Sequence, residues 1–322
     1  MLARPWLLPA LLLLVPAAFL VALTSGSATS GGQALAVLIG ADDPLARAVV
    51  VELRLPRALA AFAAGGLLAL AGALMQALLR NPLADPYVLG VSGGAAVGAL
   101  LALALGFGAL LLAPAAFVGA LVSTLIVFAL ANGPGGRTPT RLLLTGIVVA
   151  SGWGAVIAFI LSVAPEAGLR GMLFWLMGDL AQAGSPWPAL AVLAAGGLLA
   201  LTLARPLNVL LSGELQARAL GVAVAPLRLT LFFLAALLTA TAVSLAGSIG
   251  FVGLVVPHLI RLLAGSDHRV LLPATILAGG SLLLLADTAA RTVISPQQLP
   301  VGVLTALLGV PLFLWLLHRG RS

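Results

Sequence analysis

The sequence consists largely of apolar stretches, each about as long as a bilayer is thick. A transmembrane helix needs about 20 consecutive apolar residues to cross a hydrocarbon core of about 30 Å. Charged residues and clusters of Pro and Gly separate the stretches, and this pattern predicts about ten membrane-spanning helices. The predicted spans lie near residues 6–23, 57–79, 87–105, 114–130, 141–164, 188–204, 226–246, 251–264, 270–290 and 300–317. A further short helix is predicted near residues 169–178.

The composition excludes a fold that is solvated by water over most of its surface. Hydrophobic residues make up 62% of the chain and charged residues only 8%, whereas soluble domains carry about 25% charged residues. Ten spans use most of the 322 residues, which leaves no room for a sizeable soluble domain. We therefore predict an all-α polytopic membrane protein, with one transmembrane domain over residues 1–322 and lipid around it.

The distribution of arginine predicts the orientation of the chain in the membrane. The first apolar stretch is longer than that of most signal peptides and contains Pro9 and Pro16, so we expect residues 1–28 to be retained as a first helix rather than cleaved. With the N-terminus inside, cytoplasmic segments hold 11 Arg against 3 acidic residues (+8), and the other face holds 5 Arg against 6 (−1). This asymmetry fits the positive-inside rule and predicts that both termini lie in the cytoplasm, with the chain in the inner membrane.

The residue content of the predicted spans indicates that the chain cannot supply transport energy by itself. A transporter coupled to protons or sodium ions needs ionisable or chelating groups at mid-membrane depth, and every charged residue here falls in a loop or near a predicted helix end. The chain also lacks the GxxxxGK[ST] phosphate loop, so we expect a separate ATPase as the motor.

Catalysis and cofactor binding are not predicted. A membrane-embedded enzyme would need polar or metal-binding residues clustered at one depth, and none is evident. Cysteine is absent, and His258, His268 and His318 lie far apart in the sequence, so no metal site or other cofactor is expected. The net charge of +7 comes from arginine alone and does not indicate nucleic-acid binding.

The longest predicted cytoplasmic connection runs from Arg205 to Arg228. Its coupling segment, at about residues 205–225, has the pattern of an element to which such a motor would dock. Ser212 is a suitable cap for a short helix that Gly221 would end. Apolar residues recur on one face of this helix, and a Glu–Arg pair occupies the favoured i,i+4 spacing on another. The residues of this predicted coupling segment are Leu211, Glu214, Leu215, Arg218 and Gly221. A connector that lies on the membrane surface is the alternative interpretation.

Several polar segments together resemble one transporter family. The segments are RLPR at residues 54–57, GALMQALLRNPLADPYVLGVSGGAA at 72–96, LNVLLSGELQARALGV at 207–222, GSIGFVGLVVPHLIRLLAGSDHRVLLP at 247–273, LLLADTAAR at 283–291 and LPVGVLTALLGVPLFLWLL at 299–317. In this order they resemble the FecCD permease family, the membrane subunits of ABC importers for iron-siderophore, haem and cobalamin. The resemblance covers nearly the whole chain from Glu52 onward.

The resemblance implies a type II ABC importer fold with ten helices per subunit and inverted helical halves. It also implies a homodimer with the pathway between two copies, two cytoplasmic ATPase subunits, and a periplasmic binding protein that delivers a bulky metal chelate. The segments SDHRVLLP and LPVG look most like the cobalamin branch, while haem and siderophores stay open. Gln298 departs from the pattern, because a cobalamin permease often has an acidic residue there.

The resemblance further implies roles for residues at both ends of the predicted helices. Matching arginines of the family receive acidic residues of the binding protein, and the turn after the second helix contributes to a cytoplasmic gate. The candidates are Arg54, Arg57 and Arg291 for docking, and Asn81, Leu83 and Thr140 for the gate. Read without the family, the arginines would be interfacial anchors, and Asn81-Pro82 would simply end a helix. Asp287 is expected to pair with Arg291 at i,i+4 spacing.

Overall fold

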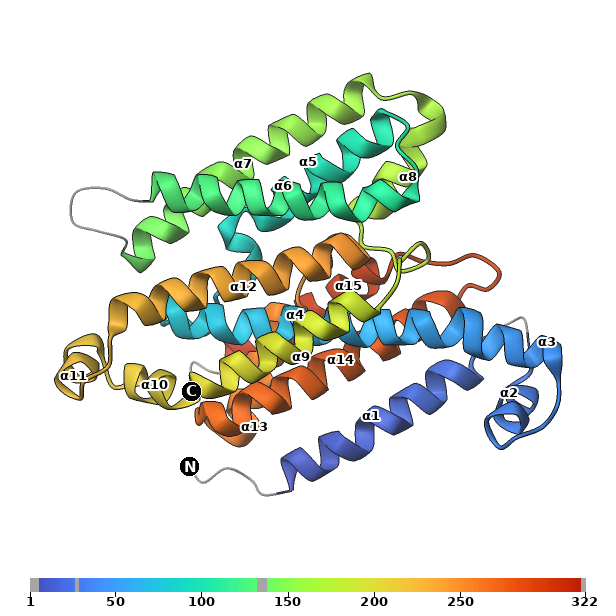
Figure 1. Ribbon diagram of the computed structural model, residues 1–322, viewed down its shortest axis with the longest axis horizontal. Coiled ribbons are helices and arrows are strands. Elements are labelled where there is room, and N and C mark those ends of the chain that lie inside the picture. Colours follow the sequence, from blue (N-terminus) through green and yellow to red (C-terminus); the bar gives the residue numbers. More distant parts are fainter. Residues whose placement is uncertain (1–5, 27–28, 132–137, 320–322) are drawn as a thin grey trace.

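The computed structural model describes residues 6–26, 29–131 and 138–319, and this part of the chain is helical without strands (Figure 1). Arg4, Arg137 and Arg321, three of the 11 arginines assigned to the cytoplasmic side, lie outside the described residues. The helices are α1 (Leu7–Thr24), α2 (Gly31–Leu38), α3 (Pro44–Arg47), the π-helix η1 (Ala48–Arg54), α4 (Leu55–Leu79), the 3-10 helix η2 (Pro86–Leu89), α5 (Val91–Ala104), α6 (Ala109–Leu130), α7 (Pro139–Val163), α8 (Glu166–Leu176), α9 (Trp187–Thr202), α10 (Ala204–Leu211), α11 (Glu214–Ala219), α12 (Val224–Ala246), α13 (Val252–Ala264), α14 (His268–Thr292) and α15 (Val301–Arg319).

Each predicted span corresponds to one of these helices. In the described part of the chain, six helical stretches are long and apolar enough to cross a membrane, and α9 with α10 forms a seventh that bends by 54°. The shorter apolar helices α5, α13 and α15 account for the remaining three predicted spans. The prediction of about ten spans in an all-α fold is therefore confirmed, and α8 is the predicted short helix near residues 169–178.

Helix α4 forms the centre of the bundle, where it packs against α12, α13 and α14 (Figure 1). Its inward-facing residues are mostly alanine and glycine, which let neighbouring backbones approach closely. Gly72 is the clearest case, because a Cβ atom at this position would overlap the backbone of Gly253 in α13. The small residues of α4 therefore permit its contact with three neighbouring helices.

The start of this central helix differs from the prediction. The helical stretch runs continuously from Pro44 to Leu79 rather than beginning near residue 57. Asp43 and Pro44 explain the earlier start, since the Asp43 carboxylate accepts a hydrogen bond from the Ala46 amide at 3.0 Å and Pro44 occupies the first turn. Arg54 and Arg57 consequently lie inside a helix and not at its end.

A long helix followed by a break and a shorter helix occurs twice, as α4–η2–α5 and as α12–α13, and the two breaks contact each other. The Tyr87 hydroxyl accepts a hydrogen bond from the Ile249 amide and donates one to the Ile249 carbonyl, both at 2.9 Å. The hydroxyls of Ser92 and Ser248 lie 2.9 Å apart. Polar groups of the two breaks thus satisfy one another within the fold.

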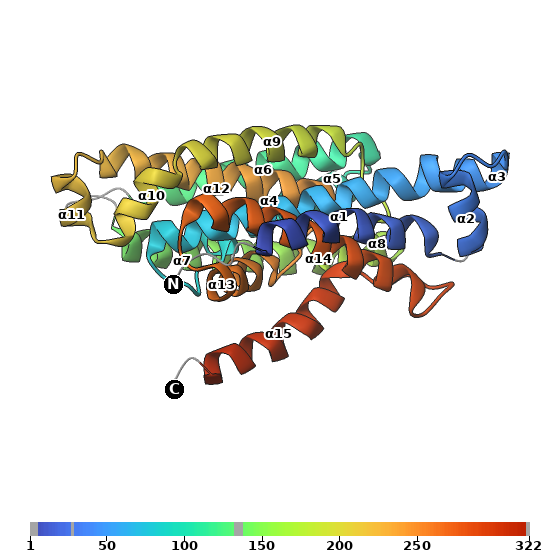
Figure 2. The ribbon, with the colours of Figure 1, turned by 90° about the horizontal axis from the view of Figure 1, so that it is seen from below.

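The two ends of the bundle carry different elements. Helices α10 and α11 lie at one end, and the N-terminal end of α1 and the C-terminal end of α15 point toward it (Figures 1 and 2). Helices α2, α3 and α8 lie at the other end. We call these the coupling end and the docking end, after the roles predicted for their residues.

Candidate docking, gate and coupling sites

At the docking end, Arg57 forms a bidentate ion pair that joins α4 to α14. Its Nη2 and Nε atoms lie 2.8 and 2.9 Å from the two oxygens of Asp287, and its Nη1 donates to Gln298 Oε1 at 2.8 Å. The Asp287 side chain is only 2% exposed. A planar guanidinium suits this geometry because two parallel N–H groups match a carboxylate.

The other two predicted docking residues also make contacts within the chain. Arg54 is 5% exposed and donates to the carbonyls of Leu23 at 2.7 Å and Thr29 at 3.4 Å. Arg291 donates to the carbonyl of Ala22, and its Nε lies 3.9 Å from Asp287. The expected Asp287–Arg291 pair is therefore present, but Arg57 is the closer partner of the carboxylate.

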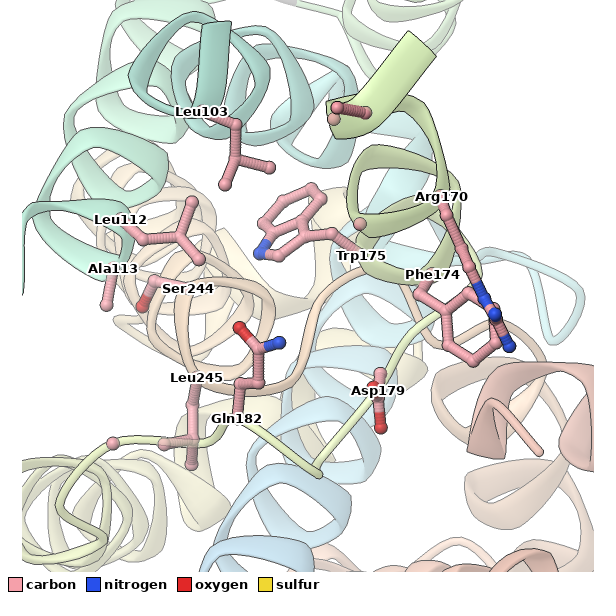
Figure 3. Close-up of a pocket in the computed structure, with 14 residues that line it drawn as sticks. Leu103, Leu112, Ala113, Arg170, Phe174, Trp175, Asp179, Gln182, Ser244 and Leu245 are labelled. Atoms are coloured by element: carbon pink, nitrogen blue, oxygen red, sulfur yellow. The ribbon is translucent and has the colours of Figure 1, made fainter. Parts of the chain in front are cut away.

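A cavity of about 520 Å³ lies at the docking end between α8, the end of α12, and the ends of α5 and α6 that face each other (Figure 3). Trp175 and Gln182 point into it, while the Arg170 guanidinium lies 5.5 Å from the centre of the Phe174 ring. Trp175 packs against the core at the cavity wall. The lining combines aromatic surface with a few polar groups, as small-molecule sites do.

The predicted gate residues Asn81 and Leu83 belong to a tight turn that follows α4. Arg80 ends the helix in a left-handed conformation (φ 50°), and Asn81 Oδ1 accepts a hydrogen bond from the Leu83 amide at 2.9 Å. Thr140 lies in the first turn of α7 and is exposed, as are Asn81 and Leu83. In the described part of the chain no hydrogen bond connects Thr140 to this turn.

The coupling segment folds as two short helices, α10 and α11, with one departure from the predicted pattern. Ser212 ends α10 and does not cap α11, because Gly213, with φ 116°, stands at the cap position. Gly221 follows α11 with φ 81°, as predicted, and its amide donates to the Arg218 carbonyl at 3.0 Å. The predicted i,i+4 pair of Glu214 and Arg218 is present at 2.8 Å.

Apolar side chains of this segment are exposed at the coupling end. Leu211 is 48% exposed, Leu215 85% and Leu220 70%. By contrast, Ala217 on the other side of α11 is fully buried. A six-residue helix that shows leucine to the outside and alanine to the bundle is suited to contact another protein.

Asn208 attaches the coupling segment to α14. Its side-chain amide donates to Asp267 at 2.7 Å, and its carbonyl oxygen accepts from the His268 amide at 2.9 Å. Hydrogen bonds from the Arg269 amide and from Asn208 hold the pKa of Asp267 below its usual range. This contact was not predicted, since the two segments are about 60 residues apart and nothing in the sequence pairs them.

Metal ligands do not gather in the part of the chain that the structure describes. There, no three His, Asp or Glu side chains come close enough together to hold a metal ion.

Ten spans, a docking end with arginines and a coupling end with exposed leucines define a multi-pass membrane permease of the ABC importer class. The chain belongs to the FecCD transport family, whose model matches residues 12–319. The resemblance inferred from the sequence segments is thereby confirmed.

Relatives with assigned names support this class. The cobalamin import system permease protein BtuC of Halobacterium salinarum is 46% identical over 279 residues, which are 85% of this chain and 74% of that protein. The hemin transport system permease protein HmuU of Yersinia pestis is 44% identical over 84% of each chain. A solved structure, described as an inward-facing conformation of an ABC transporter assigned to the metal-chelate type, has a TM-score of 0.87 and 34% identity, and covers 98% of this chain and all of that chain.

Proposed function

We propose that this permease carries a bulky metal chelate from the periplasm to the cytoplasm, driven by two copies of a separate ATPase. The observation that carries the proposal is the coupling end, where a short helix exposes leucine residues on a chain that lacks a phosphate loop of its own. A motor protein that covers these leucines would bury apolar surface, and its movement would then move the coupling segment relative to the other helices. Both termini would then lie on the cytoplasmic side, which the arginine asymmetry also favours.

Cobalamin is our first candidate for the chelate, and haem is the second. Relatives at 46% and 44% identity are named for cobalamin and hemin, so identity alone separates them weakly. The sequence segments at the start of α14 and α15 favour cobalamin, while Gln298 departs from that branch. Ferric siderophores remain the third class to be tested.

A second copy of the chain would complete the pathway. Only 11% of an apolar 18-residue stretch of α7 is buried within the chain. Leu307 and Leu308 on α15 are also exposed. We propose that these faces border the pathway and the second copy. Thr140 at the start of α7 would then meet the turn of Asn81 and Leu83 across the assembly to form the cytoplasmic gate.

Arginines at the docking end would receive acidic residues of a periplasmic binding protein. Arg54, Arg57 and Arg291 lie at this end, which supports the proposal, but each also makes contacts within the chain. A docking acid would therefore have to share the guanidinium of Arg57 with Asp287. Charge reversal at these positions would disturb the fold as well as docking, so the test needs a separate measure of stability.

Uptake into proteoliposomes tests the function. Vesicles that hold the permease, its ATPase and its binding protein receive labelled cobalamin, haem or a ferric siderophore, with and without ATP. We expect ATP-dependent uptake of one chelate, which identifies the substrate. Uptake that persists without the ATPase, under an ion gradient, would instead identify a secondary transporter.

The docking proposal is tested with Arg57→Gln and Arg291→Gln, compared with Arg218→Gln at the coupling end. We expect the first two to weaken binding of the binding protein and to make this binding less sensitive to salt, because charged contacts are screened by ions. Thermal unfolding of each variant identifies those that lose stability. A folded Arg57→Gln permease with parental affinity and salt dependence would contradict the proposal.

A further inference from the structure

The carboxylate of Glu214 is the meeting point of three arginines from three different elements. Glu214 is the first residue of α11, and its Oε1 atom lies 2.8 Å from Arg218 Nη2 in the same helix. Its Oε2 atom lies 2.9 Å from Arg228 Nη2 in α12 and 3.8 Å from Arg80 Nη2 at the end of α4. One oxygen is thus used within α11, and the other connects α11 to the bundle.

The Arg228 contact is more enclosed than an ordinary surface ion pair. The Arg228 and Glu214 side chains are 20% and 28% exposed, whereas Arg218 is 62% exposed. Arg228 Nε is buried and donates no hydrogen bond to any other group among the described residues. Because a partly buried guanidinium without an acceptor is costly, Arg228 holds Glu214 in place more firmly than Arg218 does.

The Arg80 contact leads directly to the predicted gate. Arg80 ends α4 in a left-handed conformation and immediately precedes Asn81, so the turn that contains Asn81 and Leu83 begins at the residue whose side chain approaches Glu214. Exposed ion pairs contribute little to stability, so the Arg80 contact is not needed to hold the fold together. A weak contact of this kind breaks and forms readily when α11 moves.

The two attachments of the coupling segment differ in character. Asn208 fixes α10 to the start of α14 by hydrogen bonds of 2.7 and 2.9 Å, while α11 is attached by the buried Ala217 and by ion pairs of the Glu214 carboxylate. Of the two helices, α11 is the one whose ion pairs lead to α12, through Arg228, and to the turn after α4, through Arg80.

We propose that Glu214 is a positioning residue that transmits movement of α11 to the gate turn through Arg80 and Arg228. The inference rests on the proposed function, because it presumes an ATPase that moves α11. In this scheme, Glu214 acts within the permease chain, and the exposed leucines of α11 make the contact with the motor.

The first test measures uptake per ATP hydrolysed by the complete importer in proteoliposomes, with the chelate that the parental complex takes up. We expect Glu214→Gln to assemble with the ATPase and hydrolyse ATP, but to lower the uptake per ATP about tenfold, within the range of ordinary coupling between distant sites. Glu52→Gln is the matched control, because it makes the same chemical change at an exposed position of the docking end, and it should retain the parental ratio. A parental ratio in Glu214→Gln would overturn the inference.

Exchange of the charges separates this role from direct contact with the ATPase. Arg228→Glu alone should lower the uptake ratio as Glu214→Gln does, and Glu214→Arg combined with Arg228→Glu should restore at least half of it. If Glu214→Gln does not assemble with the ATPase, this exchange of charges still tests the inference. Failure of the double variant to recover any uptake would overturn the inference, because the two side chains then do not act as a pair.

Labelling of the gate turn gives a readout that simple loss of stability would not reproduce. The chain has no cysteine, so Leu83→Cys, at a position that is 40% exposed, introduces its only thiol. We expect a non-hydrolysable ATP analogue to change the rate at which a water-soluble maleimide labels this thiol, and Glu214→Gln to abolish the change. A nucleotide-dependent rate that persists in Glu214→Gln would overturn the inference. If instead the parental complex takes up no chelate with ATP, the proposed function fails.

Discussion

Asp287 carries a negative charge in a nearly closed environment, and two arginines from different elements share it. Burial of a single charge is costly, but the bidentate contact with Arg57, whose Nη1 also donates to Gln298, offsets much of that cost. Removal of one partner is far more damaging than the net contribution of the pair would suggest, because the other charge stays buried. The cluster of Arg57, Asp287 and Arg291 is therefore sensitive to any change that alters only one of its members.

Replacement of this carboxylate by an amide should lower stability. We expect Asp287→Asn to destabilise the permease by about 3 kcal/mol, near the lower end of values for broken buried pairs, since Arg57 is 16% exposed and can reach water. Thermal unfolding of the purified protein in detergent measures the effect. Glu52→Gln, at an exposed position of the same end, is the control and should leave the transition unchanged. Equal transitions in both variants would contradict the structural role.

The Asp85 carboxylate next to the gate turn gives stability a dependence on pH. Burial raises the pKa of Asp85 to about 6, while a hydrogen bond from the Tyr87 amide acts in the opposite direction. The unfolded pKa is about 3.9, so the folded state binds the proton more tightly. This contribution to stability is complete below about pH 4 and is lost as the pH rises through 6.

Asp85→Asn should remove this part of the pH dependence. An amide cannot ionise, yet it can still accept the Tyr87 amide hydrogen bond that the carboxylate accepts at 2.7 Å. We expect the unfolding temperature of the parental protein to fall between pH 4 and 6.5, and that of the variant to fall less. Identical pH profiles for the two proteins would show that Asp85 is not responsible.

Residue patterns predicted which arginines would gather at the docking end but not what they would contact. Arg54 donates to the backbone carbonyls of Leu23 and Thr29, and a carbonyl leaves no sign in a sequence. Arg57 pairs with a residue 230 positions away, which only the packing of α4 on α14 brings close. The nearby Asp287–Arg291 pair was predictable because its spacing is local, but it is the longer of the two contacts.

At the scale of elements, the apolar runs were sufficient to predict the spans, since a bilayer tolerates little else than an apolar helix of the right length. The short polar helices were harder to predict. Helix α10 continues from α9 after a bend, so the predicted span 188–204 ends at the first residue of α10, Ala204. Ser212 was a reasonable helix cap by type, but Gly213 alone tolerates the backbone angles that the junction requires.

The contact between α4 and α13 depends on glycine. A methyl group at residue 72 would overlap the backbone of Gly253, and a backbone cannot move aside as a flexible side chain can. We expect Gly72→Ala to destabilise the permease by about 1–3 kcal/mol or more, as overpacked cores do, and to lower its yield in membranes. Fluorescence-detected size-exclusion chromatography measures the folded fraction.

The matched control for this substitution is Gly32→Ala. Gly32 lies in the exposed helix α2, where an added methyl group meets no atom within 4 Å. Alanine is also the better helix former, so the control should fold at least as well as the parent. A Gly72→Ala protein that behaves like this control would contradict close packing of α4 on α13.

At the scale of the whole molecule, the proposed assembly makes a prediction about pairs of chains. Thr140 is exposed at the start of α7, and the proposal places it at the gate between two copies. Because the chain has no cysteine, Thr140→Cys introduces a single thiol per copy. We expect a short bifunctional maleimide to join two copies, with a yield that changes when the ATPase binds nucleotide.

The position opposite the gate provides the control for this experiment. Gly32→Cys lies at the docking end in α2 and should not join copies under the same conditions. Cross-links from both positions in equal yield would indicate random collision in the membrane. A lack of cross-links from Thr140→Cys in every nucleotide state would contradict a gate formed by two copies at this residue.

The meeting of the two helix breaks has a consequence for how the protein is made. Helices α5 and α13 have 14 and 13 residues, so they span only about 20 Å of a hydrocarbon core of about 30 Å. A break that lies inside this core finds no hydrogen-bond partner in lipid. Tyr87 finds its partner Ile249 only 162 residues later in the chain. At about 5–20 residues per second, the ribosome needs roughly 8–30 s to supply that partner. During this interval the insertion machinery has to shelter the first break, and the two halves become stable in the membrane only together.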